Sequence, residues 1–204
     1  MNNLQAVALF SFLSIITPGP NNLMIMASSM NFGVRKSLPH YFGIVVGFPL
    51  MLLTMGLGLN AVFERLAWFH DALLILSTIM MVYLAYRVAT FSGPATGAKQ
   101  SSGAPRKPLG FMAAVLFQWV NPKAWFMATA AVALFPPGAS APWRDALASA
   151  LVMLVIALLC VGVWLLMGAK LSLWLNSPTK ARVFNTAMAG SLVAFFLYSM
   201  VQAV

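Results

Sequence analysis

Two short motifs in this sequence contain residue types that can bind a charged small molecule. The first, Thr-Pro-Gly-Pro-Asn-Asn, occupies positions 17–22, and the second, Gln-Trp-Val-Asn-Pro-Lys, occupies positions 118–123. Each lies inside a long apolar run, where polar and charged groups are costly and mark function by default. They define our candidate substrate-binding residues: Pro18, Gly19, Pro20, Asn21, Asn22, Gln118, Asn121, Pro122 and Lys123.

The prolines predict that a helix breaks at each motif. Proline has no backbone N–H, and its ring clashes with the preceding helical turn. Pro18, Gly19 and Pro20 in succession favour an unwound stretch over a simple kink. The alternative is that these prolines only kink packed helices, because proline and glycine are common in membrane helices.

A new half-helix should begin after each break. Asn121 is a suitable N-cap and Pro122 a suitable first helical residue, and Asn21 or Asn22 can serve the same end in the first motif. The first N–H groups of a half-helix lack intrahelical partners and lie at the positive end of the helix dipole. Away from bulk water, such ends suit a carboxylate ligand.

Lys123 is the one charge that lies clearly inside an apolar run. Its ammonium could attract a substrate carboxylate, or lose a proton during a transport cycle. Asn21, Asn22 and Gln118 would then recognise the remaining polar groups of the substrate. The alternative is a lysine that snorkels along a water-filled break.

The elements that carry these motifs are long apolar segments. Each is long enough to cross a ~30 Å hydrocarbon layer, and helices satisfy every backbone amide within the segment. The runs are continuously apolar, which disfavours a β-barrel. The predicted spans are 4–29, 38–63, 66–91, 109–135, 146–169 and 183–204.

The two motifs lie at similar depths in the first and fourth spans. Since each half of the chain holds an odd number of spans, the second half is inverted relative to the first. Paired broken helices in two inverted halves indicate a transporter's binding site. We therefore predict an all-α integral membrane protein with six transmembrane helices, arranged as two inverted three-helix repeats with broken first and fourth helices. One domain, 1–204, would comprise repeat one (1–91), a cytoplasmic linker (92–108) and repeat two (109–204).

Composition and charge agree with a membrane protein. The chain is 61% hydrophobic and 7% charged, with a net charge of +9. Its basic residues sit in short loops between apolar runs, which is typical of membrane topology and not of nucleic-acid binding. One predicted side carries only Arg65 and Arg144, and the other carries nine basic residues: Arg35, Lys36, Arg87, Lys99, Arg106, Lys107, Lys170, Lys180 and Arg182. The positive-inside rule places those nine in the cytoplasm and both termini outside.

Cysteine and acid content argue against chemistry within the membrane. Cys160 is the single cysteine, so no internal disulfide, thiol pair or cysteine-rich metal site can form. No cluster of histidine and acidic residues inside a span offers a metal site or an acid–base pair. We predict no enzyme activity, no catalytic residue, no metal and no cofactor.

At these motifs the sequence resembles the lysine exporter and homoserine/threonine exporter (LysE/RhtB) superfamily. The resemblance covers essentially the whole chain, and within the superfamily it is greatest to exporters of cysteine and O-acetylserine. It rests on both motifs and on these further residues: Gly33, Arg35, Gly43, Gly47, Tyr83 and Leu84. It implies export of amino acids, driven by the proton gradient or the membrane potential. Many relatives carry an acid just after the second of these span-two glycines, where this chain has Phe48 and Pro49, which makes proton coupling through a buried acid doubtful.

The predicted function is a secondary transporter that exports amino acids or close derivatives across the cytoplasmic (inner) membrane. Its partners would be a small amino-acid substrate and the lipid bilayer, with no nucleic acid. A homodimer is plausible for so small a transporter. The alternatives are a membrane-embedded subunit or partner-dependent binding protein and, less in keeping with the residues, a membrane enzyme.

Overall fold

The computed structural model describes residues 3–59, 108–135, 142–174 and 177–203, together with isolated positions between 68 and 86. Regular structure in these parts of the chain is entirely helical, as predicted. The predicted span 66–91 and the linker 92–108 lie almost wholly outside the described residues. The elements are α1 (Asn3–Ile16), α2 (Pro20–Thr54), the π-helix η1 (Met55–Leu59), α5 (Phe111–Phe117), the 3-10 turn η2 (Gln118–Val120), α6 (Pro122–Val132), α7 (Pro142–Trp174) and α8 (Pro178–Ala203).

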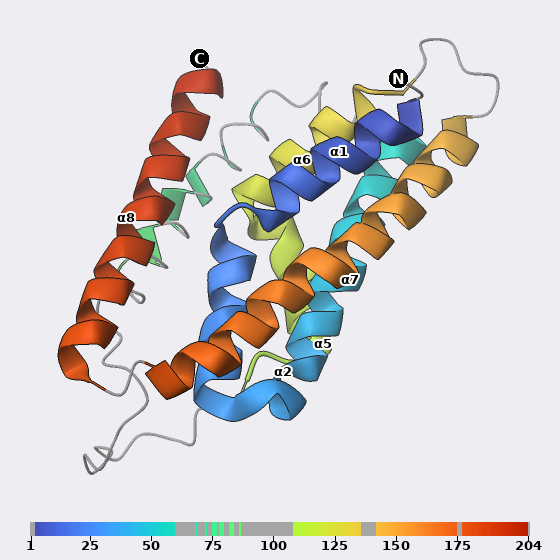
Figure 1. Ribbon diagram of the computed structural model, residues 1–204. Coiled ribbons are helices and arrows are strands. Elements are labelled where there is room, and N and C mark those ends of the chain that lie inside the picture. The colour runs from blue at the N-terminus through green and yellow to red at the C-terminus, as the bar shows by residue number, and fades with distance from the viewer. Residues whose placement is uncertain are drawn as a thin grey trace.

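Helix α2 contains a turn that divides it into two legs. Gly33 has φ 78° and ψ 165°, a left-handed conformation that glycine adopts at little cost. The chain reverses direction there, at the lower end of the molecule in Figure 1. The leg before the turn includes the end of the first predicted span, and the leg after it includes most of the second, whose residues 60–63 lie outside the described residues. Arg35 and Lys36 follow the turn and are exposed, as expected for a short basic loop.

Helix α2 packs between α7 and α5. The crossing with α7 is close, because a Cβ on Gly168 would overlap the side chain of Ser29. The packing against α5 is equally tight, because a Cβ on Gly43 would overlap the Phe111 carbonyl and one on Gly47 would lie 2.7 Å from Gln118 Cγ. Small residues permit such approach between helix backbones. Gly43 and Gly47 thus form a packing seam, and this seam brings the second motif against α2.

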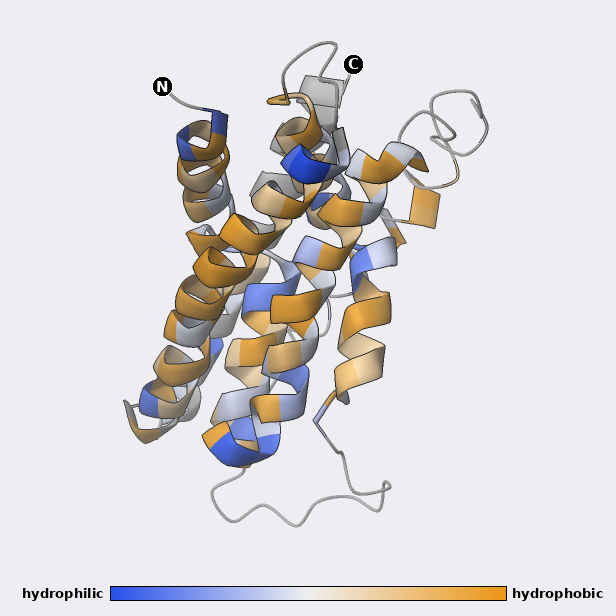
Figure 2. Ribbon diagram, turned by 90° about the vertical axis from the view of Figure 1, so that its right-hand side faces the viewer, coloured by the Kyte–Doolittle hydropathy of each residue, from blue (hydrophilic) through white to orange (hydrophobic). Residues whose placement is uncertain are grey.

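The outer surface of the helices is apolar. Leu159 on α7 exposes 68% of its area, and Figure 2 shows hydrophobic residues along much of the helices' length. Within the described residues, Pro20–Leu59 and Trp143–Leu171 are long and apolar enough to cross a membrane. Asn3–Ile16 and Phe111–Val120 are apolar but shorter, since a break ends each of them. Such a surface suits lipid, where exposed apolar side chains cost nothing.

Basic residues gather at one end of the molecule. The turn of α2, the end of α7 and the start of α8 share the lower end in Figure 1, and both chain termini lie at the opposite end. The lower segments carry Arg35, Lys36, Lys170, Lys180 and Arg182. Four more residues assigned to this side, at 87, 99, 106 and 107, lie outside the described residues. The arrangement is consistent with the predicted charge asymmetry.

Candidate functional site

Both predicted breaks are present, at the predicted motifs. Helix α1 ends at Ile16 and α2 begins at Pro20, so residues 17–19 are not helical. Gly19 is fully extended, with φ −173° and ψ 175°. The second break is at Asn121, which has φ −93° and ψ 112° between η2 and α6. The prolines therefore end one helix and start another, and do not merely bend a continuous one.

The start of α6 follows the prediction and the start of α2 does not. Asn121 is the N-cap of α6, where its Oδ1 accepts the Lys123 backbone N–H at 3.1 Å, and Pro122 is the first residue. The N-cap of α2 is Gly19, so the prediction of Asn21 or Asn22 as cap is wrong. The fixed φ of Pro20 suits the first helical position, and starting the helix there places both asparagines inside its first turn.

A buried pair of amide side chains joins the two breaks. Asn21 Nδ2 donates to Gln118 Oε1 at 2.7 Å, and Gln118 Nε2 donates to Asn21 Oδ1 at 3.3 Å. Gln118 Nε2 also donates to the Ala114 carbonyl at 2.9 Å. Asn21 exposes 3% of its area and Gln118 exposes none. Gln118 therefore holds Asn21 in place, and it does not line the cavity described below.

Lys123 makes a second connection between the breaks. Its Nζ donates to Thr17 O at 2.8 Å, Thr17 Oγ1 at 2.9 Å and Pro18 O at 3.2 Å. These oxygens follow the C-terminal end of α1, where the helix dipole is negative and favours a cation. The ammonium of this buried side chain thus has charge-assisted, partly buried partners, which offset the cost of placing it there.

Other side chains bind the neighbouring carbonyls of α1. Asn22 Nδ2 donates to Ile15 O at 2.6 Å and to Thr17 O at 2.8 Å. Trp164 Nε1, on α7, donates to Ile16 O at 3.1 Å. These are the carbonyls that the break deprives of helical partners, and each is satisfied by a side chain instead.

The two connections are reciprocal. If Pro20 is superposed on Pro122, Asn21 and Lys123 become equivalent second residues of their half-helices. Each reaches across to the break in the other half of the chain, Asn21 to Gln118 and Lys123 to the segment before Pro20. The two halves of the chain are therefore tied together at the same place by equivalent positions.

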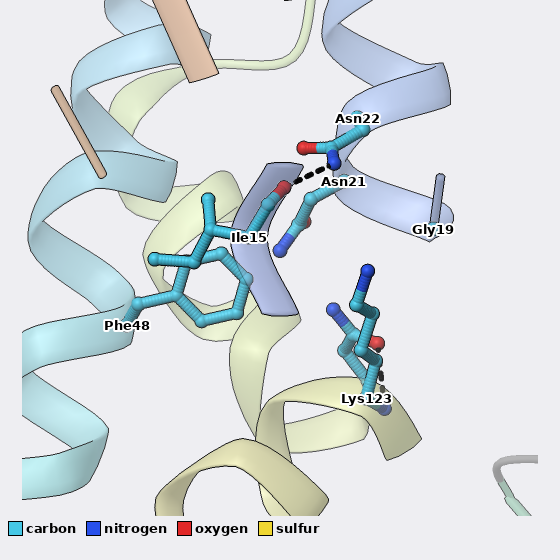
Figure 3. A pocket seen from close by; sticks show the side chains of 7 residues that line it. Ile15, Gly19, Asn21, Asn22, Phe48 and Lys123 are labelled. Carbon is cyan, nitrogen blue, oxygen red and sulfur yellow. Dashed lines mark hydrogen bonds between the residues drawn. The ribbon is translucent and has the colours of Figure 1, made fainter. Parts of the chain in front are cut away.

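A small cavity lies between the breaks. Its side chains leave room for only about one water molecule in this conformation. Figure 3 shows Asn21 and Asn22 on one side, Lys123 reaching toward Gly19 on the other, and Ile15 beside Phe48. Among the described residues that line it, none is acidic. The lining residues are Ile15, Gly19, Asn21, Asn22, Phe48, Asn121 and Lys123.

The cavity offers hydrogen-bond donors and positive charge. Asn121 Nδ2 is buried and has no hydrogen-bond partner. The first backbone N–H of α2 that reaches a backbone carbonyl is that of Leu23, bound to Gly19 O at 3.0 Å. The amides of Asn21 and Asn22 precede it, at the positive end of the helix. In α6 the corresponding N–H groups of Lys123 and Ala124 are bound to Asn121. An anionic group such as a carboxylate would therefore meet α2 amides, the Asn121 amide and the Lys123 ammonium.

The structure brings the nine predicted residues together, in different roles. Five line the cavity, and these are Gly19, Asn21, Asn22, Asn121 and Lys123. The prolines shape the breaks, and Gln118 binds Asn21 behind the cavity wall.

The sequence motifs did not identify Ile15 and Phe48 as lining residues, or Thr17 as a partner of Lys123. Phe48 had one signal, its place directly after the seam glycine Gly47, where the resembling family often has an acid. Thr17 belongs to the first motif but was not selected from it. No sequence signal distinguished Ile15, since it is an apolar residue in an apolar helix.

Comparison with known proteins identifies relatives of one kind. The family model described as "LysE type translocator" matches residues 12–202. A cysteine/O-acetylserine efflux protein of Klebsiella pneumoniae subsp. pneumoniae is 30% identical over 120 residues, which cover 59% of this chain and 58% of the relative. Proteins of that name from Escherichia coli strain K12 and Shigella flexneri serotype 5b are 28% identical over 139 residues, 65% of each chain. The matches thus span less than two thirds of these relatives' length. No solved structure matches the chain.

Proposed function

Because the chain belongs to the LysE type translocator family, a family of membrane transporters and not of enzymes, we propose that it exports amino acids or close derivatives. The observation that carries this proposal is the cavity between the two breaks. It combines buried donors and a lysine ammonium with an apolar wall, within a protein whose outer surface is apolar. Ligand pockets of this kind use a few fixed polar groups for orientation and apolar contacts for the rest.

The substrate we propose is a small amino acid, with cysteine and O-acetylserine as the first candidates. Relatives that align with about three fifths of this chain are named for efflux of these two compounds. The size of the cavity supports a small side chain, because Ile15 and Phe48 close one wall and little empty space remains. The substrate carboxylate would contact Asn121, Lys123 and the amides of Asn21 and Asn22.

The proposed mechanism is alternating access by two inverted three-helix repeats, 1–91 and 109–204, joined by the linker 92–108. The reciprocal connections through Asn21 and Lys123 support two equivalent halves. Rocking of one half against the other would open the cavity first to one side of the membrane and then to the other. Export would be driven by the proton gradient or the membrane potential, with Lys123 as the charged group inside the cavity.

We further propose that the protein lies in the cytoplasmic (inner) membrane, with both termini outside and the basic end of the molecule in the cytoplasm. The gathering of described basic residues at the end opposite the termini supports this orientation. Homodimerisation stays a prediction.

The test is efflux from cells preloaded with labelled cysteine, O-acetylserine and a panel of other amino acids. Cells that contain the protein should lose one or a few small amino acids faster than cells without it. Lys123→Met should abolish the difference. Lys170→Met is the matched control, because Lys170 is an exposed lysine at the end of α7. Equal loss of every compound with and without the protein would overturn the substrate class.

A second experiment separates a complete transporter from a partner-dependent subunit. The purified protein is reconstituted alone in liposomes and assayed for exchange of the compound identified in cells. Exchange without any other protein supports the proposal. Efflux in cells combined with no exchange in liposomes would favour the subunit.

A further inference from the structure

The Lys123 side chain is bound in this protein as a ligand would be. Its Nζ has three oxygens within 3.2 Å, the carbonyls of Thr17 and Pro18 and the Thr17 hydroxyl. An ammonium group has three donors and no acceptor, so this set of oxygens meets its bonding requirement. Lys123 exposes 5% of its area and lines the cavity, where Figure 3 shows its side chain reaching toward Gly19.

The oxygens form a site for primary ammonium ions in general. Both carbonyls belong to the non-helical segment between α1 and α2, so the donors they accept from are side chains, Lys123 Nζ for both and also Asn22 Nδ2 for Thr17 O. The C-terminal dipole of α1 adds negative potential at the same place. The Thr17 hydroxyl is oriented as an acceptor, because its own hydrogen is given to Ser14 O at 2.8 Å. The ε-ammonium of lysine and the α-ammonium of an amino acid present the same donors to such a site.

We infer that the oxygens of Thr17 and Pro18 are the binding site for the substrate's α-ammonium group, and that Lys123 occupies this site in the empty protein. This inference rests on the proposed function and extends it. When substrate binds, its ammonium replaces that of Lys123 on the oxygens. The released Lys123 then pairs with the substrate carboxylate. No charge remains buried without a partner at either stage, as the high cost of an unpaired buried charge requires.

A separate observation identifies where the carboxylate would lie. Asn121 is fully buried, and its Nδ2 has no partner although it lines the same cavity. Buried donors are almost always bonded, so an unpaired one calls for a ligand acceptor. Gly19 also lines the cavity and leaves room for the Lys123 side chain, because a Cβ there would lie 2.7 Å from Lys123 Cδ. The two ends of a zwitterion thus have complementary groups, the Thr17 and Pro18 oxygens for the ammonium and the Asn121 amide for the carboxylate.

The consequence is that the substrate must carry both a free α-amine and a free carboxylate. An N-acylated amino acid cannot displace Lys123 from the oxygens. A simple amine can bind them only by expelling Lys123, with no carboxylate to receive it. Removal of the lysine ammonium should therefore convert the protein from a zwitterion binder into an amine binder.

The experiment compares cysteine, N-acetylcysteine and cysteamine as competitors of labelled cysteine on the purified protein under reducing conditions. Thermal stabilisation by each compound is measured in parallel, because it reports binding without requiring transport. On the natural sequence, cysteine should bind at least about tenfold more tightly than either analogue, the equivalent of one lost charged hydrogen bond. On Lys123→Met, stabilisation by cysteamine should correspond to at least about tenfold tighter binding than on the natural sequence.

A second variant keeps the test valid if Lys123→Met folds poorly. Thr17→Val removes one oxygen of the site and retains the lysine, so it should weaken cysteine binding about tenfold. The matched control is Thr129→Val, because Thr129 is exposed on α6 and its hydroxyl bonds only to carbonyls of its own helix, those of Trp125 and Phe126. This control should bind all three compounds as the natural sequence does.

The outcomes separate the inference from the proposed function. If amino acids are transported but Lys123→Met gains no affinity for cysteamine, the exporter stands and the ammonium site is wrong. N-acetylcysteine that binds as tightly as cysteine would overturn the ammonium site in the same way. If no amino acid is transported and yet Lys123→Met gains cysteamine binding, the ammonium site stands and the proposed substrate class is wrong.

Discussion

The buried pair of Asn21 and Gln118 should couple the two breaks energetically, and a double-mutant cycle can measure this coupling. Asn21→Ala leaves Gln118 Oε1 buried without its 2.7 Å donor, while Gln118 Nε2 keeps the Ala114 carbonyl. Gln118→Met retains the volume of the side chain and leaves the Asn21 amide unpaired. Each change should cost about 1–3 kcal/mol, the penalty of one unsatisfied buried polar group.

The double variant should cost less than the sum of the two. Once one amide has been removed, removal of the other leaves no further polar group without a partner. The coupling free energy between the two positions should therefore be about 1–2 kcal/mol. The assay is unfolding of the purified protein in detergent, followed by its helical circular dichroism. Exchange in liposomes is measured on the same four proteins. We expect each single variant to lose transport about tenfold or more, equivalent to about 1.4 kcal/mol.

A matched pair elsewhere in α2 provides the control. Ser28 Oγ and Ser37 Oγ lie 2.8 Å apart and are buried, on either side of the turn at Gly33. The alanine variants of this pair should show coupling in stability and unchanged transport, because the pair does not join the two halves of the chain. Additive costs for Asn21 and Gln118, within about 0.3 kcal/mol, would refute the reasoning. Equal loss of transport in the serine variants would refute the specific role of the breaks.

Three further predictions concern the packing, the cavity and the topology. Gly47→Ala should destabilise the protein by about 1–3 kcal/mol in detergent unfolding, because the added Cβ would lie 3.2 Å from the backbone of α5. The control is Gly162→Ala, which should leave stability unchanged because its Cβ would meet no atom closer than 3.6 Å. Phe48→Leu should shift the efflux ratio toward larger amino acids, because the ring closes one wall of the cavity, and Phe42→Leu on the lipid-exposed face should leave the ratio unchanged. Alkaline phosphatase, which is active only outside the cytoplasm, should be active when fused to the C-terminus and inactive when inserted in the linker 92–108. The reverse pattern would contradict the predicted orientation.

Features set by local chemistry could be predicted from the sequence. Proline fixes its own φ and lacks a donor, so the motif around Pro20 and the motif around Pro122 must interrupt a helix wherever they occur. The cap at Asn121 follows from the preference of asparagine for that position. The close packing at Gly43 and Gly47 follows from the absence of a Cβ on one helical face. In each case the residue itself restricts what its neighbours can do.

Features that depend on long-range placement could not be predicted. Gln118 was expected to contact the substrate, but its amide is taken by a residue 97 positions earlier. Lys123 was expected near a carboxylate, and its partners in the structure are carbonyls 105 and 106 positions earlier. Phe48 reaches the cavity because the turn at Gly33 returns the second leg of α2 past the first break. Residue type determines which hydrogen bonds a side chain can make, and the fold determines which partner it makes them with.

The reciprocity of the two connections bears on how such a protein could move. The N-terminus of a helix carries positive potential and the C-terminus carries negative potential. Each break therefore contains one negative end, from the helix before it, and one positive end, from the helix after it. Here Lys123, from the start of α6, binds oxygens that follow the end of α1, and Asn21, from the start of α2, binds the side chain of Gln118, the first residue of η2. The two breaks are therefore joined by the protein's own groups, and any relative motion of the two halves must break one or both connections. A zwitterion supplies a cation and an anion that can replace the Lys123 connection without leaving a buried charge unpaired. Substrate binding would then lower the cost of separating the halves, while an empty protein would keep them joined, and this is the coupling between binding and motion that an exporter requires.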